Sequence, residues 1–204
     1  MEFKKLGKSD LKVSSYCLGT MTFGEATSET DSHVQIDQSI ASGINFIDTA
    51  EMYPTCPLRE QTTGDTEVII GNWIEKNKSK RADFILASKI SGKGYKAVRN
   101  GEGIDEKSIK IAIEGSLKKL KTDYIDLYQL HWPNRGSYHF RQNWNYNPTN
   151  QDTVLAKDNM NGVLNSLSDL QKEGKIRYIG LSNETCWGTS QFLDQLKNFS
   201  NLTK

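Results

Sequence analysis

Residues 105–131 have the sequence DEKSIKIAIEGSLKKLKTDYIDLYQLH, in which the pattern of a helix is followed directly by that of a buried strand. Apolar or small side chains recur at spacings of 3, 4, 7, 8 and 11 residues from Ile109 to Leu120, which is one helix face. Asp105 can cap the start of this helix. The segment Ile125–His131 is short and mostly apolar, as in a strand covered on both faces.

The same alternation extends outward in both directions. Further strand-length apolar stretches are Tyr16–Gly19, Ile44–Ala50, Phe84–Lys89 and Arg177–Ser182. Helical periods separate them, as in the groups Ile70, Trp73, Ile74 and Met160, Val163, Leu164, Leu167. At least four strand–helix units after a leading strand predict βαβ connections and the α/β class.

The opening segment, Glu2–Leu18, differs from the rest. Two short strand-like runs flank the turn composition Gly7-Lys8-Ser9-Asp10, which predicts a hairpin that closes one end of the fold.

Two architectures fit the alternation, a doubly wound sheet and a (β/α)₈ TIM-type barrel. The Gly-x-Gly-x-x-Gly turn after the first strand is absent, which favours the barrel. A complete barrel takes about 250 residues, whereas five expected strands leave three unaccounted for. We therefore expect residues 1–204 to form a single but incomplete barrel domain, with a hairpin and about five βα units. A truncated gene product, an incomplete sequence and a split protein would each account for this.

Charge and cysteine content exclude several classes of function. The formal net charge is +1, so no overall field would attract nucleic acid or an anionic membrane. Neither a signal peptide nor an apolar run of about 20 residues occurs, which indicates the cytoplasm. The three cysteines and three histidines lack the spacing of a disulfide framework or a zinc site, so we expect no metal.

A long irregular segment, 132–156, interrupts the alternation. It combines Asn, Gln, Gly and Pro with the aromatic residues Tyr138, Phe140, Trp144 and Tyr146. Loops of this length are usually functional or disordered, and the aromatic content argues against simple disorder. A wall or lid of a pocket and a self-packed surface excursion remain equally good interpretations.

Polar groups collect at the ends of the expected strands, at Gly19-Thr20, Asp48, Lys89, His131 and Ser182-Asn183. In a barrel these carboxyl ends converge on one face, where catalytic groups lie. Each residue also has an ordinary interpretation. Asp48 could bind its own loop, Tyr53 could be a loop aromatic, Lys89 could turn to solvent, His131 could pack beneath Trp132, and Asn183 could cap a helix.

Together these groups have a use in reducing a carbonyl. The developing alkoxide needs a proton donor, and an ordinary tyrosine with a pKa of about 10 holds its proton too tightly for best efficiency. A cation about 4 Å away contributes roughly 4 kcal/mol, so we expect Lys89 to bring the pKa of Tyr53 towards neutrality. Asp48 would hold the ammonium, and a neutral His131 would donate a hydrogen bond to the carbonyl oxygen.

At these residues the sequence resembles the aldo-keto reductase superfamily, whose Asp, Tyr, Lys and His tetrad matches Asp48, Tyr53, Lys89 and His131. The surrounding matches are LGTMTFG (18–24), GINFIDTAEMY (43–53), DYIDLYQLHWP (123–133) and GKIRYIGLSN (174–183). The motifs EMYP (51–54) and GNW (71–73) further resemble its bacterial Tas-like branch.

The resemblance implies a (β/α)₈ barrel that reduces small-molecule carbonyls with NADPH, or in some cases NADH. Tyr53 would be the general acid, and Ser182 and Asn183 would bind the nicotinamide carboxamide. The further cofactor contacts would be Gly19, Thr20, Met21 and Asp48, and the substrate pocket would include Tyr53, His131 and Trp132. The strands not accounted for would hold the adenosine and 2′-phosphate.

Two other functions stay open at this point, a non-catalytic cofactor-sensing or regulatory subunit and an inactive fragment of a reductase. An open barrel exposes a strand edge and an apolar face. We therefore expect poor solubility, or association through a complementing C-terminal fragment or an oligomer.

Overall fold

The computed structural model describes residues 1–139, 142–199 and 202 of the chain. A two-stranded antiparallel hairpin pairs β1 (Phe3–Lys5) with β2 (Lys12–Ser14). The main sheet is parallel, with the order β3-β4-β5-β6-β7. Its strands are β3 (Leu18–Gly19), β4 (Phe46–Asp48), β5 (Ile85–Ile90), β6 (Ile125–Leu130) and β7 (Ile176–Leu181).

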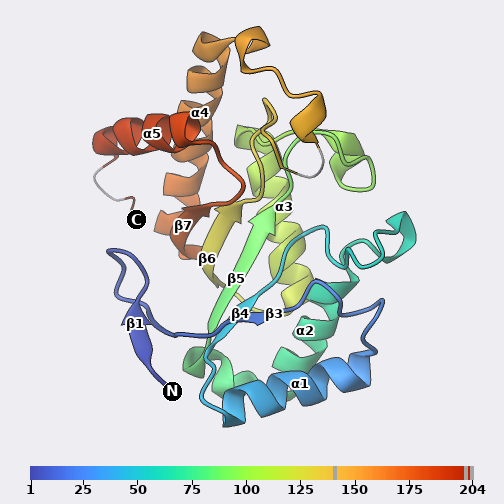
Figure 1. Cartoon of the computed structure of the whole chain (residues 1–204). Coiled ribbons are helices and arrows are strands. Elements are labelled where there is room, and N and C mark those ends of the chain that lie inside the picture. The colour runs from blue at the N-terminus through green and yellow to red at the C-terminus, as the bar shows by residue number, and fades with distance from the viewer. Residues whose placement is uncertain (140–141, 200–201, 203–204) are drawn as a thin grey trace.

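Within the described residues, five α-helices connect and follow these strands, and Figure 1 shows them succeeding one another around the sheet. They are α1 (Glu29–Ala41), α2 (Asp65–Lys76), α3 (Glu106–Leu120), α4 (Thr153–Lys172) and α5 (Cys186–Gln195). Short 3₁₀ helices are η1 (Glu60–Thr62), η2 (Lys78–Asp83), η3 (Arg99–Gly101), η4 (Gln142–Trp144), η5 (Pro148–Asn150) and η6 (Leu196–Asn198).

The strand order separates the two architectures that the sequence allows. A doubly wound sheet reverses its strand order at a switch point, whereas here each strand lies beside the next one in the chain. The sheet therefore has the arrangement of part of an α/β barrel.

The main core lies between the sheet and the helices. Alternate residues of the strands face it, among them Ile47, Leu86 and Tyr128, and the predicted face of α3 covers them. Asp105 caps α3 as predicted, because its side chain accepts hydrogen bonds from the backbone N–H groups of Lys107 and Ser108.

The hairpin covers the end of the sheet opposite the predicted site. Leu11 and Val13 are buried against Ile85, the first residue of β5, with Phe46 and Tyr178 at the margin. This agrees with the predicted hairpin, although its strands are shorter than the runs from which it was predicted.

Residues 132–156 combine both interpretations that the sequence left open. Trp144 is 88% exposed, and Tyr138 packs edge-on against Tyr146, as in a self-packed surface segment. Asn134 and Arg135, in contrast, line a cavity. Phe140 lies outside the described residues.

Within the described residues, no helix is long and apolar enough to cross a membrane.

Candidate active site

The four predicted catalytic side chains meet at the carboxyl end of the parallel sheet. Asp48 ends β4, Lys89 lies one residue before the end of β5, and His131 directly follows β6. Tyr53 lies in the loop after β4. The carboxyl ends of adjacent parallel strands lie at the same edge of the sheet, so residues far apart in sequence become neighbours.

Asp48 and Lys89 form an ion pair. Lys89 Nζ donates to Asp48 Oδ2 at 2.6 Å and to the carbonyl oxygen of Thr49 at 2.8 Å. Gln129 Nε2 donates to the other carboxylate oxygen, Asp48 Oδ1, at 3.1 Å. The Lys89 side chain is only 7% exposed, so these bonds fix a buried cation at this place.

Tyr53 contacts both that cation and His131. Lys89 Nζ is 4.9 Å from the centroid of the Tyr53 ring. The His131 ring meets Tyr53 edge-on, with 5.7 Å between the centroids. Met52 and Trp132 pack behind Tyr53 in a small apolar cluster of their own, so the phenol is partly enclosed.

The electrostatics confirm one sequence-based expectation and correct another. Burial lowers the pKa of His131 to about 3, with the charge of Lys89 as the next cause, so the imidazole is neutral as expected. Burial raises the pKa of Tyr53 to about 12, with the negative charge of Asp48 as the next cause. The pKa of Tyr53 is therefore raised in this structure and not lowered as expected from Lys89, because burial is the main influence and Asp48 acts in the same direction.

The predicted cofactor contacts at the end of β3 occupy different environments. Thr20 is fully buried, and its hydroxyl donates to the carbonyl oxygen of Asp48 at 2.8 Å. Its side chain therefore joins β3 to β4. Gly19 is exposed, with open space where a side chain would start, and Met21 is 44% exposed.

Ser182 and Asn183 follow β7, beside His131. The backbone N–H of Ser182 donates to the carbonyl oxygen of Leu130. Asn183 Nδ2 donates to the carbonyl oxygen of His131 at 2.9 Å and to Ser182 Oγ at 3.0 Å. Asn183 has φ +51°, in the left-handed region. It does not cap α5 as the sequence suggested, because Thr185 does so through Gly188 N.

Comparison with known proteins gives a match to the aldo/keto reductase family over residues 16–200. The chain belongs to the aldo/keto reductase family. It is 45% identical to Protein tas of Escherichia coli (strain K12) over 196 residues, which cover 95% of this chain and 55% of that protein. It is 32% identical to the uncharacterized oxidoreductase YrpG of Bacillus subtilis (strain 168), covering 92% of this chain and 51% of that protein.

A solved structure shares the fold. The aldo-keto reductase AKR11C1 from Bacillus halodurans, in its holo form, has a TM-score of 0.70 and 30% sequence identity. The match covers 96% of this chain and 54% of that one. The chain therefore spans about half the length of the relatives it matches.

The exposed polar atoms after β7 fit a nicotinamide carboxamide. Asn183 donates through Nδ2, which leaves Oδ1 available to accept from an amide N–H, because no described residue donates to it. Ser182 Oγ accepts from Asn183, so its own proton is available to an amide oxygen. These two residues of the aldo/keto reductase chain are thus able to hold both ends of a carboxamide.

Two polar contacts of the site were missed from the sequence. Gln129 donates a hydrogen bond to Asp48. Gln129 lies two residues before His131 and therefore on the same strand face, which would have indicated that its side chain belongs to the site. Glu51 forms a buried ion pair with Arg99 and accepts from Ser91 N at 2.8 Å. That pair ties the loop carrying Tyr53 to the segment after β5, and nothing in the local pattern pointed to Arg99.

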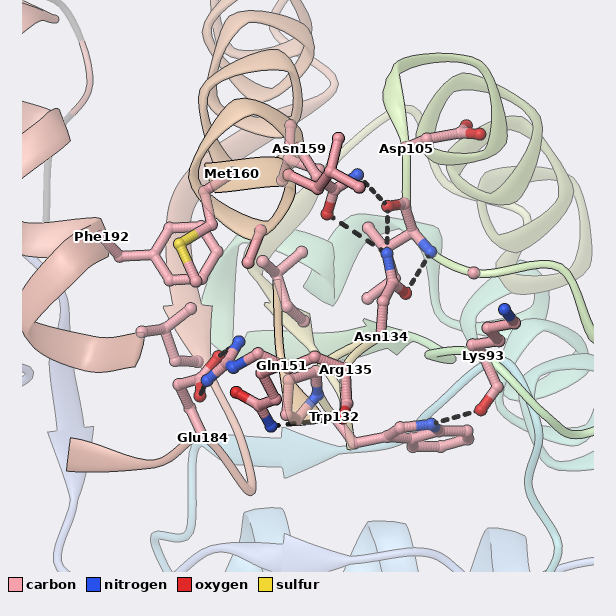
Figure 2. Close-up of a pocket in the computed structure, with 18 of the residues that line it drawn as sticks. Lys93, Asp105, Trp132, Asn134, Arg135, Gln151, Asn159, Met160, Glu184 and Phe192 are labelled. Carbon is pink, nitrogen blue, oxygen red and sulfur yellow. Dashed lines mark hydrogen bonds and ion pairs between the residues drawn. The ribbon is translucent and has the colours of Figure 1, made fainter. Parts of the chain in front are cut away.

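A cavity of about 890 Å³ lies beside the catalytic side chains. Figure 2 shows Trp132, Asn134, Arg135 and Glu184 among its lining residues. Trp132 and Ser182 line this cavity, whereas Asp48, Tyr53, Lys89 and His131 do not. The cavity is therefore a neighbour of the candidate active site, with Trp132 shared between them.

Proposed function

We propose that this aldo/keto reductase chain carries the proton-transfer part of a nicotinamide-dependent carbonyl reduction, with Tyr53 as general acid. One observation carries the proposal: the Tyr53 ring contacts both a buried cation and a neutral imidazole, and Asn183 is bonded to the backbone of that same histidine. Small aldehydes or ketones are the proposed substrates.

Each side chain has a separate part in this reaction. The Tyr53 hydroxyl gives its proton to the oxygen of the reduced carbonyl, and the Lys89 ammonium stabilises the phenolate that is left. His131, neutral because of its burial, donates a hydrogen bond from a ring nitrogen to the same oxygen. Asp48 and Gln129 hold Lys89 in place.

The cofactor we propose is NADPH, with NADH as the second possibility, and its reduced nicotinamide supplies the hydride. Ser182 and Asn183 would hold its carboxamide, with Gly19 and Met21 at the opposite side of the sheet end. Two similar proteins support a redox function for this chain: AKR11C1 was solved in a holo form, and YrpG is named an oxidoreductase.

The test is consumption of NADPH in the presence of a reactive aldehyde or quinone. Tyr53→Phe should lower turnover by roughly 10²- to 10⁴-fold, the usual contribution of a general acid, and should leave NADPH binding unchanged. Tyr16→Phe is the matched control, because Tyr16 is 69% exposed. Undiminished turnover of Tyr53→Phe would mean that another group is the acid.

Detectable NADPH binding by the parent chain separates this proposal from an inactive fragment. Binding without any turnover would favour the regulatory alternative.

A further inference from the structure

The long segment after His131 is joined to the segment after β7 by a buried ion pair. Arg135 pairs with Glu184, and both side chains are nearly enclosed, with 11% and 6% of their area exposed. Arg135 also donates to Thr185 Oγ1 at 3.0 Å. Its guanidinium lies 5.0 Å from the Trp187 ring centroid. Figure 2 shows Arg135 and Glu184 side by side at one end of the cavity.

Gly188 makes room for this pair. A Cβ at Gly188 would lie 2.2 Å from Arg135 Nη2 and 2.2 Å from Glu184 Oε1. Because real Cβ atoms do not approach other atoms so closely, any side chain here would displace the pair. The first turn of α5 is therefore shaped around the guanidinium and the carboxylate.

A second link lies nearer to the catalytic side chains. Ser137 is buried, and its hydroxyl donates to the carbonyl oxygen of Asn183 at 3.0 Å. Asn183 is held in its left-handed conformation by this bond and by its own bond to the carbonyl oxygen of His131. A conformation of this kind persists in a non-glycine residue when its neighbours enforce it.

We propose that Arg135 is a positioning residue that holds Ser182 and Asn183 at the place where they bind the nicotinamide carboxamide. This inference rests on the proposed function. The Arg135–Glu184 pair fixes the chain directly after Asn183, and Ser137 fixes the carbonyl of Asn183 itself. Residues 133–137 thus form a clamp on residues 182–185. His131 and Trp132 directly precede the clamp. The clamp therefore links the residues proposed to contact the carbonyl substrate to Ser182 and Asn183, which are proposed to contact the cofactor.

The binding test compares Arg135→Met and Arg135→Lys with the parent chain, using NADPH and reduced nicotinamide mononucleotide as probes. Arg135→Met should weaken binding of both probes by roughly tenfold. A lysine cannot reach Glu184 and Thr185 with a planar fork, so Arg135→Lys should restore little. The control is Lys121→Met, which removes an ion pair with Glu75 on the protein surface.

Exchanging the two charges tests whether the effect on binding acts through the Arg135–Glu184 pair. The double variant Arg135→Glu with Glu184→Arg should recover part of the binding that each single change loses. Unchanged binding in Arg135→Met, or a loss as large in Lys121→Met, would overturn the proposal.

Amide hydrogen exchange tests the clamp without any cofactor. The N–H groups of Ser182, Thr185 and Gly188 are hydrogen-bonded. Their exchange should accelerate in Arg135→Met and not in Lys121→Met. Full protection of residues 182–188 in Arg135→Met would rule the clamp out. If the parent binds neither probe, the proposed function fails for this chain, and the exchange result alone decides the clamp.

Discussion

At the residue scale, burial influences the pKa of Tyr53 more than its charged neighbours do. Lys89 lies over its ring, but the ammonium donates to Asp48 at 2.6 Å. The negative charge of Asp48 adds to the effect of burial, because it disfavours a second negative charge on the phenol. Tyr53 is therefore a fully protonated donor at neutral pH, with its pKa raised to about 12.

This state predicts how proton donation depends on pH. Tyr53 gives its proton only in the protonated form, and that form predominates at every pH below the raised pKa. The chemical step of reduction should be independent of Tyr53 ionisation from about pH 6 to about pH 9. Single-turnover rates of NADPH oxidation measure it. A tenfold fall in rate per pH unit above neutrality would show that Lys89 lowers the pKa after all.

The lowered pKa of His131 predicts that the folded chain loses stability in acid. Its pKa falls from about 6.5 in the unfolded chain to about 3 in the folded chain, mainly through burial. Its contribution is present above pH 6.5 and is lost as the pH falls towards 3, at no more than about 1.4 kcal/mol per pH unit.

Denaturant unfolding of the parent and of His131→Gln at several pH values measures this contribution. The variant should lose less stability than the parent between pH 6.5 and 3. Equal losses in the two proteins would show that His131 binds protons equally well when folded.

The sequence could indicate the identity of the site residues but not all of their partners. Asp48, Lys89 and His131 were predictable because each lies at the end of an apolar strand. The pKa of Tyr53 was not, because it depends on how deeply a loop residue is buried and on the Asp48–Lys89 distance. Arg99 was hidden for a similar reason, since its partner Glu51 is 48 residues away.

At the element scale, α2 and α3 approach closely at one glycine. A Cβ at Gly71 would lie 1.9 Å from the carbonyl oxygen of Lys119 in α3. Gly71→Ala should force the helices apart and destabilise the fold by roughly 1–3 kcal/mol. Gly115, inside α3, has nothing within 4 Å of its Cβ position. Gly115→Ala should stabilise by about 0.5–1 kcal/mol through helix propensity.

Thermal or urea unfolding of the two alanine variants provides the measurement. An equal loss of stability in both variants would mean that the close approach of α2 and α3 is not the reason that Gly71→Ala is destabilising.

Helices and strands whose apolar residues recur at a regular spacing were predictable from the sequence, and those without such spacing were not. The apolar face of α3 identified it from sequence, and Ile125–Leu130 matched its predicted strand to within one residue. The helix α1 was not named in advance, because it fully buries only Ser32 and Ile36 and has few apolar residues to mark a face. The arrangement of residues 132–156 depends on distant partners such as Glu184, which local pattern does not contain.

At the scale of the whole molecule, the parallel sheet has two edges within the described residues, β3 and β7. Its face away from the helices is only partly covered, because most of β7 is half-buried and Tyr16 and Cys17 beside β3 are exposed. Unpaired strand edges favour association. We expect the 204-residue chain to self-associate with rising concentration, as sedimentation velocity would show. A monomer with a cooperative thermal transition would contradict this.

The most direct test of the proposed reaction follows the hydride into the product. NADPH that carries deuterium at the transferring position of its nicotinamide is mixed with the chain and an aldehyde, and the alcohol is analysed by mass spectrometry. The geometry at Tyr53, Lys89 and His131 predicts one deuterium on the carbinol carbon with the parent chain and very little product with Tyr53→Phe. An alcohol without deuterium, or equal product from both proteins, would contradict the assignment of these residues to carbonyl reduction.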